Sequence, residues 1–257
     1  MVFTQAAPSH LPPTAPPPKP PSTYPPVWAS IAADLQSSMM SQGTCTNLAR
    51  QTVRLSFHDC FPGSCDGSII LANECTTRVE NNRMVEICDT LGAAAPSYNV
   101  TTADLIQFAA AIGIASCSSG PITSFYAGRT DSFTASLTGQ VPGANANANA
   151  LVSQFAAKGF TTTELVALTG SHTIGRNRGG AIDSTIGKWD SGFYGQVSKG
   201  TAPNPIPADV SLSNSTVTMK VWNAVRKSQG AFDSAFVPAM EKMSLMGWRK
   251  ADLVDRS

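Results

Sequence analysis

Residues 54–71 read RLSFHDCFPGSCDGSIIL and carry an arginine, a phenylalanine and a histidine within five positions. In a helix, the i, i+4 spacing puts Arg54 and His58 on one face, with Phe57 beside them on the same wall. A cation and a potential base then share one pocket. Such a pair can take a proton from a weak acid and stabilise the negative charge that develops as a bond breaks. Arg54 and His58 are therefore candidate catalytic residues, although a solvated helix face has the same pattern.

A second histidine lies in residues 168–175, LTGSHTIG. Gly170 and Ser171 are small and leave room for a flat group, and the imidazole of His172 can ligate a metal. A ligating imidazole usually donates its other N–H to a carboxylate, but sequence alone does not identify that partner. Taken singly, each histidine could also be a core residue with satisfied hydrogen bonds.

The composition is that of a globular chain. The 257 residues are 42% apolar and 14% charged, which is enough for a large core. The net charge of +1 comes without a basic cluster, which argues against a nucleic-acid partner. The longest apolar stretches, such as residues 105–115, are far shorter than the roughly 20 residues of a membrane-spanning helix. We therefore expect neither a nucleic-acid partner nor a membrane span.

The pattern outside the histidine segments is mostly helical, which predicts a mainly α fold. Thr161 and Glu164 form the capping box of a helix that runs through His172 and ends at Gly175. The other predicted features are a helix capped by Thr101 or Thr102 with Asp104 in its first turn, helices over about 219–225 and 229–243, and a surface loop over 139–150.

Two features outside this pattern concern the chain's environment. Ten of the eighteen prolines lie between Pro8 and Pro26, so residues 1 to about 26, including His10, read as a tail or linker, with an SH3-type ligand as the alternative. Six cysteines allow three bridges in fifteen pairings, and none has C-x-x-C spacing. Disulfides would indicate an oxidising compartment. No signal peptide is visible at the N-terminus.

Together, these stretches resemble the plant, fungal and bacterial haem peroxidase superfamily over roughly residues 30–257. The two histidine segments are similar to its distal and proximal signatures, and Phe57 replaces the tryptophan of the intracellular branch, so the secreted branches are the nearer match. The resemblance implies a two-lobed helical fold with haem b between a distal lobe, about 27–140, and a proximal lobe, about 141–257. Other matching segments follow in order: ENN (80–82), ADLIQFA (103–109), GPITSFYAGRTD (120–131) and FVPAMEKMSLMGW (236–248).

The resemblance also implies roles for single residues. His172 would ligate the haem iron and Phe57 would contact the haem. Asp209, in PIPADVSLSN (205–214), would be the carboxylate partner of His172, with a loop cap as the alternative. On the other face Arg54 and His58 would act on peroxide.

The distal histidine would itself have a partner. Asn81 would accept its second N–H, with Asn82 as the alternative. Glu74, the usual next partner, lies seven residues before Asn81 where relatives generally have six.

Two calcium ions and three disulfides follow from the same resemblance. Oxygen ligands beside both histidines suit a hard cation, although ordinary turn and cap chemistry could explain the proximal ones. The implied distal set is the side chains of Asp59, Asp66 and Ser68 with main-chain carbonyls near Pro62 and Ser64, and the implied proximal set is Thr173, Asp183, Thr185 and Asp190 with a carbonyl near Lys188. The implied disulfides are Cys60–Cys65, Cys45–Cys117 and Cys75–Cys88.

The substrate positions favour small aromatic donors. Asn47, Gln51 and Arg178 stand where manganese-oxidising relatives have carboxylates, and Ala167 stands where lignin-oxidising relatives expose a tryptophan. Trp189 and Trp222 are expected to pack in the core, with a role as radical carriers as the alternative. Pro142 resembles a proline at the haem edge.

We therefore expect a secreted, monomeric peroxidase that reduces hydrogen peroxide and oxidises small phenolic or aromatic donors in one-electron steps. The alternatives are a manganese- or lignin-oxidising peroxidase, a haem protein of the same fold with little turnover, and a haem-free, calcium-stabilised extracellular interaction module.

Overall fold

The computed structural model describes residues 25–257, so nearly all of the predicted tail, His10 included, lies outside the described residues. The described chain is mainly α, as predicted, with twelve α-helices and three two-stranded antiparallel ribbons. The helices of the first half are α1 (Pro26–Met39), α2 (Asn47–Cys60), α3 (Ser68–Leu71), α4 (Glu74–Thr77), α5 (Val85–Tyr98) and α6 (Thr102–Ala115).

The second half contains six further α-helices and two 3-10 segments. Its α-helices are α7 (Ala148–Ala157), α8 (Thr162–Thr169), α9 (Gly192–Lys199), α10 (Pro207–Asn214), α11 (Met219–Val225) and α12 (Gln229–Ser244). The 3-10 segments are η1 (Gly170–Ile174) and η2 (Lys250–Asp252). The ribbons pair β1 (Met40–Ser41) with β2 (Thr44–Cys45), β3 (Tyr126–Ala127) with β6 (Val254–Asp255), and β4 (Arg176–Asn177) with β5 (Gly180–Ala181).

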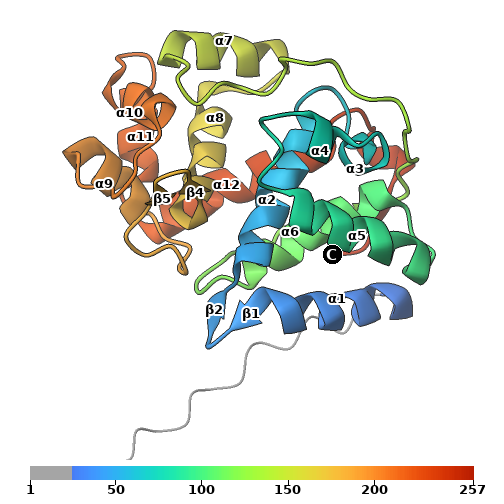
Figure 1. Cartoon of the computed structure of the whole chain (residues 1–257). Helices are drawn as coiled ribbons and strands as arrows, with labels where there is room; N and C mark the ends of the chain where they lie inside the picture. The colour runs from blue at the N-terminus through green and yellow to red at the C-terminus, as the bar shows by residue number, and fades with distance from the viewer. Residues whose placement is uncertain (1–24) are drawn as a thin grey trace, which may run out of the picture.

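Helices α1–α6 gather on one side of the molecule and α7–α11 on the other, with α12 running between them (Figure 1). Helix α12 packs against both α8 and α2. The chain then returns to the first group, because β6 pairs with β3. No helix in the described range 25–257 is both long and apolar enough to cross a bilayer.

The α2–α6 packing fixes the helix that carries Arg54 and His58. Nearly every residue of α6 is buried. A Cβ on Gly113 of α6 would lie 2.3 Å from the Thr52 Oγ1 atom and 2.7 Å from the Ala49 carbonyl oxygen of α2. Only glycine allows this approach, so the two helices are held together tightly at this point.

Local signals set the starts of α6 and α8 as predicted. The Thr101 hydroxyl accepts the Asp104 N–H at the start of α6, and the capping box of Thr161 and Glu164 is formed at the start of α8. The predicted loop over 139–150 is wrong at its end, because the Asn147 side chain caps α7 and residues 148–150 are helical. The helix predicted through His172 is also different: α8 ends at Thr169 and His172 lies in η1.

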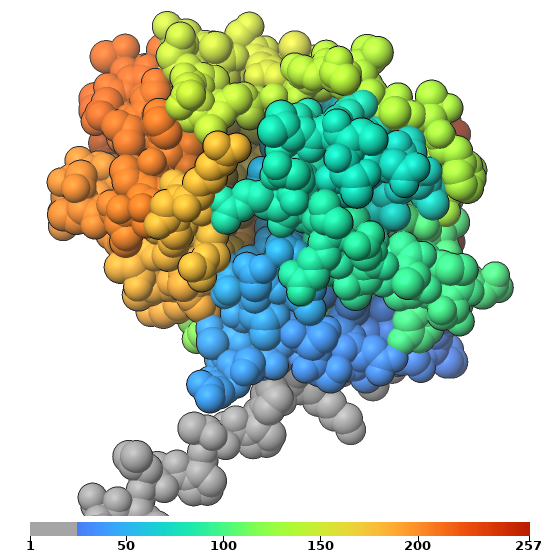
Figure 2. All heavy atoms as spheres, in the orientation of Figure 1, coloured from blue at the N-terminus to red at the C-terminus, as the bar shows by residue number. Residues whose placement is uncertain are grey.

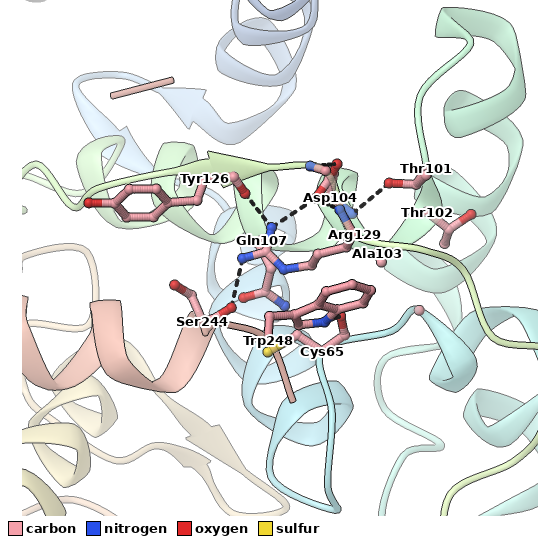
Figure 3. Close-up of polar contacts among 12 residues, drawn as sticks. Cys65, Thr101, Thr102, Ala103, Asp104, Gln107, Tyr126, Arg129, Ser244 and Trp248 are labelled. Atoms are coloured by element: carbon pink, nitrogen blue, oxygen red, sulfur yellow. Dashed lines mark hydrogen bonds and ion pairs between the residues drawn. The ribbon is translucent and has the colours of Figure 1, made fainter. Parts of the chain in front are cut away.

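A buried arginine joins three elements near the C-terminus (Figure 3). Arg129 is 1% exposed, and its Nη1 atom lies 2.8 Å from the Asp104 carboxylate of α6. The guanidinium also donates to the main-chain carbonyls of Tyr126 in β3 and of Ser244 at the end of α12. The network therefore ties the last helix to the first group of helices.

The three disulfides have the pairing that the resemblance implied: Cys45–Cys117, Cys60–Cys65 and Cys75–Cys88. They lie entirely in the first half of the described chain. Cys60–Cys65 closes the loop directly after α2, and Cys75–Cys88 connects α4 to α5.

Candidate active site

A cavity of about 1350 Å³ lies between the two groups of helices. Arg54, Phe57 and His58 of α2 line it, and so do Ser171 and His172 of η1. Most of the remaining wall is apolar, including Val53, Leu151, Phe155, Leu165, Leu168, Ile174, Ile206, Leu212, Phe236 and Met240. Side chains therefore do not fill the space between the two histidines.

The distal side of the cavity is organised around His58. Its Nδ1 atom lies 2.7 Å from the Asn81 Oδ1 atom, and the Arg54 Nε atom lies 3.3 Å from its Nε2 atom. Because the amide oxygen can only accept, Nδ1 of the neutral ring carries the proton, and the lone pair of Nε2 accepts the Arg54 Nε–H. Arg54 also donates to the Glu80 carbonyl at 2.8 Å, which holds the guanidinium in place.

Asn81, rather than Asn82, is the partner of His58. Asn81 is buried and donates its Nδ2 hydrogen to the main-chain carbonyl of Glu74 at 3.2 Å, whereas Asn82 is exposed. The carboxylate of Glu74 points elsewhere and forms an ion pair with Arg78 at 2.7 Å. The link from Asn81 to Glu74 thus uses the backbone.

The environment of His58 favours the neutral imidazole. Burial and the nearby charge of Arg54 lower the pKa of His58 to about 3, against the opposing effect of the hydrogen bond to Asn81. Above that pH the ring is an uncharged base beside a fixed cation. This is the state needed to accept a proton from a weak acid in the cavity.

The proximal side is organised around His172 and Asp209. The His172 Nδ1 atom lies 3.0 Å from both carboxylate oxygens of Asp209, which stands in the first turn of α10. Asp209 has a side chain only 1% exposed, while the His172 side chain is 37% exposed and lines the cavity. Burial lowers the pKa of His172, but the Asp209 carboxylate outweighs it and the net shift is upward. Because Nδ1 is engaged by Asp209, the Nε2 atom of the neutral ring is the nitrogen left for a ligand in the cavity.

Gly170 faces neighbouring helices rather than the cavity. A Cβ on Gly170 would lie 2.2 Å from the Phe232 ring and 2.3 Å from the Tyr194 hydroxyl, so this glycine allows close packing onto α12 and α9. The prediction that it makes room for a flat group is wrong. Ser171 does line the cavity.

The implied distal calcium residues are partly brought together. The Asp59 carboxylate accepts the Gly67 N–H at 3.2 Å, and Asp66 accepts the Ser68 N–H at 3.1 Å. Burial, with the negative charges of Asp66 and Glu74, raises the pKa of Asp59 well above its usual range, against the opposing N–H bonds.

One neighbouring group is engaged by another side chain. The Pro62 carbonyl accepts a hydrogen bond from the Lys158 ammonium at 3.0 Å. The Ser64 side chain packs against Gly247, which leaves the implied Ser64 carbonyl a prediction.

The implied proximal calcium residues converge more closely. Thr173 donates to Asp183 at 3.2 Å, and Thr185 lies within 3.0 Å of both Asp183 and Asp190. The Lys188 carbonyl is 3.4 Å from the Thr173 hydroxyl. Within residues 25–257 no three His, Cys, Asp or Glu side chains form a metal-binding group, so either ion would depend on hydroxyl and carbonyl oxygens as well.

The residues considered for substrate specificity lie either in the cavity wall or in the buried core. Pro142, Asn47, Gln51 and Arg178 all line the cavity. Ala167 is fully buried, so its position is not on the surface. Trp189 and Trp222 are also fully buried and pack among aromatic side chains, Trp189 stacked on Phe232 and Trp222 edge-on to Tyr194, as expected for core residues.

Sequence reasoning missed further arginines of the cavity wall. Arg50 and Arg176 line the cavity but belong to no motif. One signal was present: Arg50, Arg54 and His58 recur every four residues, which places all three on one side of α2.

Comparison with known proteins agrees with this geometry. A family model described as Peroxidase matches residues 31–244. Versatile peroxidase VPS1 of Pleurotus eryngii is 27% identical over 88% of this chain and 72% of its own length, and manganese peroxidase 3 of Phlebia radiata is 28% identical over 87% and 73%. An anionic peroxidase of Ipomoea batatas is 30% identical over 75% of this chain and 64% of its own length. The chain therefore belongs to the peroxidase family, whose members are hydrogen-peroxide-dependent oxidoreductases.

Proposed function

We propose that the cavity holds haem b, with the His172 Nε2 atom as the iron ligand and Phe57 against the ring. One observation carries this proposal: each histidine lines the same cavity and has its Nδ1 atom tied to a buried partner, so Nε2 is the ring nitrogen left for chemistry there, with the Arg54 Nε–H against that of His58. The apolar wall suits a flat ring system, and wall arginines with no ion-pair partner among residues 25–257 suit its two carboxylates. The residues present therefore fit the group.

Bound there, haem supplies the metal that coordinates peroxide and stores the two oxidising equivalents released when the O–O bond breaks. The distal residues handle the protons. The His58 Nε2 atom accepts a proton from hydrogen peroxide and returns it to the departing oxygen, which leaves as water. Arg54 stabilises the negative charge on that oxygen. Asn81 keeps Nε2 unprotonated at the start.

The reducing substrates are small phenols or aromatic amines that reach the cavity edge near Pro142. Each of two donors loses one electron, and each phenol also loses its hydroxyl proton. The side chains of Asn47, Gln51 and Arg178 offer no carboxylate for Mn(II), and buried Ala167 offers no exposed aromatic ring. These features favour direct oxidation of small donors over manganese or long-range lignin oxidation.

The test is a comparison of three donors on the haem-loaded protein. We expect a Soret band on reconstitution, peroxide-dependent oxidation of guaiacol, and at most slow oxidation of Mn(II) and of the non-phenolic veratryl alcohol. Reconstitution without a Soret band would support the haem-free interaction module. A Soret band without guaiacol oxidation would support a haem protein that has lost turnover.

The remaining expectations concern the lobes, the calcium ions and the compartment in which the protein acts. The lobes of about 27–140 and 141–257 enclose the haem, and one calcium ion beside each histidine holds α2 and η1 to neighbouring loops. Three disulfides are consistent with export to an oxidising compartment, where the chain acts as a monomer.

The proximal calcium ion is tested by Asp183→Asn. This variant should bind one ion fewer by elemental analysis and melt at a lower temperature, whereas exposed Asp89→Asn should change neither the metal content nor the melting temperature. Equal metal content in the two variants would refute the proximal ion.

A further inference from the structure

The cavity wall carries far more positive than negative charge. Among residues 25–257, six arginines line it, whereas the acidic lining residues are Glu80 and Asp209, and Asp209 is engaged by His172. Arg78 is paired with Glu74, and Arg54 is held at the distal site. The four others have no ion-pair partner in the described chain: Arg50, Arg83, Arg176 and Arg178.

Two of these unpaired arginines repel each other. The Arg50 Nη1 atom donates to the Cys45 carbonyl at 2.6 Å, which fixes the guanidinium, while its buried Nε atom has no hydrogen-bond partner in the described protein. Burial lowers the pKa of Arg50, and the charge of Arg176 lowers it further. A guanidinium nevertheless stays protonated. Two adjacent cations with an unused donor form a place where an anion gains charge-assisted hydrogen bonds.

The arginines border the opening of the cavity from two sides. Arg50 stands on α2, one turn before Arg54, and the exposed Arg176 and Arg178 stand in the β4–β5 hairpin that follows His172. In the space-filling view, the hairpin segment, α2 and the segment around residue 80 surround a recess (Figure 2). The same cavity has apolar lining at Val79, Val141 and Pro142.

We propose that Arg50, Arg176 and Arg178 form an anion site that binds the carboxylate of an aromatic reducing substrate. This inference rests on the proposed peroxidase function and names its substrate class. Haem b has two carboxylates, so it can neutralise at most two of the four unpaired arginines. A phenolic acid can place its carboxylate on the remaining charge and its ring on the apolar lining. The overall reaction converts one hydrogen peroxide and two phenols to two phenoxyl radicals and two waters.

The first measurement compares a donor with its uncharged twin. p-Coumarate and methyl p-coumarate have the same phenol and ring, and only the former has a carboxylate. The haem-loaded protein should oxidise the acid with kcat/KM about 10-fold higher than the ester, as expected for one charge-assisted contact. The double variant Arg176→Gln/Arg178→Gln should bring this ratio close to one through a higher KM for the acid. Exposed Arg226→Gln, which removes a charge outside the cavity, should keep the ratio.

The second measurement is binding without turnover. By calorimetry, 4-methoxybenzoate should bind the haem-loaded protein more tightly than its methyl ester, and only the acid should be weakened about 10-fold by the double variant or by added salt. The variant's melting temperature and haem affinity are measured alongside. Weaker haem binding with an unchanged acid-to-ester ratio would show that the arginines serve only the haem carboxylates, and would overturn the proposal.

The two proposals fail in different ways. Oxidation of guaiacol without any preference for the acid would overturn the anion site and leave the peroxidase function standing. Absence of guaiacol oxidation by the haem-loaded wild-type chain would overturn the peroxidase function itself. In that case tight binding of 4-methoxybenzoate over its ester would still support an anion site.

Discussion

The Nδ1 atom of His172 lies 3.0 Å from each carboxylate oxygen of Asp209, although the two residues are 37 positions apart. The carboxylate is almost completely buried, so little solvent competes for its charge. It therefore fixes the tautomer of the imidazole and makes the Nε2 atom a stronger electron donor. This geometry leads to the first prediction.

Replacing Asp209 with asparagine should retain the hydrogen bond but remove the charge. The imidazole then becomes a weaker donor, so the midpoint potential of the bound iron should rise and the reaction with peroxide should slow by ~10-fold or more. Spectroelectrochemistry and stopped-flow mixing measure the two effects. Exposed Asp89→Asn serves as the charge-matched control. An unchanged potential in Asp209→Asn would contradict the role given to this carboxylate.

The distal amide can be tested with adjacent asparagines. Asn81→Ala removes the acceptor of the His58 Nδ1 hydrogen, so the imidazole ring can turn or change tautomer. In part of the molecules Nε2 then no longer presents a lone pair to the peroxide. We expect the peroxide reaction to slow by at least ~10-fold, a fraction of the ~10²–10⁴ that a positioned base contributes. Asn82→Ala should react like the wild type, because Asn82 is exposed. Equal rates in the two variants would show that Asn81 is not the residue that orients His58.

The pH dependence follows from the depressed pKa of His58. With a pKa of about 3, Nε2 stays free to accept a proton down to acidic pH, and the peroxide reaction loses rate only as pH falls through that value. Arg54→Leu removes a charge that lowers this pKa, so its acid limb should lie at higher pH. Stopped-flow rates between pH 3 and 8 measure both profiles, and an acid limb near pH 6.5 in the wild type would contradict a buried neutral base.

The lowered pKa of His58 also affects the stability of the fold. The folded state binds fewer protons at His58 than the unfolded state between about pH 6.5 and 3, since the unfolded ring has the ordinary pKa. Unfolding is thus favoured as pH falls through that range. His58→Gln should reduce this part of the pH dependence, and denaturant unfolding at several pH values measures it.

Local chemistry explains which features the sequence could predict. The capping box of Thr161 and Glu164 and the four-residue spacing of Arg54 and His58 involve neighbours on one helix, so short-range rules suffice. The pairing of His172 with Asp209 crosses 37 residues and was available only through family resemblance. Likewise, the local sequence pattern does not show that Arg50 of α2 lies beside the β4–β5 hairpin, because the two segments meet only when the two halves of the chain pack together.

The buried Arg129–Asp104 pair provides the last prediction, one about the scaffold rather than the site. Arg129→Met leaves the Asp104 carboxylate buried without its cation, and the free energy of unfolding should fall by ~3–5 kcal/mol. Asp104→Asn keeps an acceptor for the Gly128 N–H, so the double variant Arg129→Met/Asp104→Asn should be more stable than Arg129→Met alone. Urea unfolding of the three variants measures this coupling. Additive losses would mean that Arg129 and Asp104 are not energetically coupled, and that the hydrogen bonds from Arg129 to the Tyr126 and Ser244 carbonyls carry its contribution to stability instead.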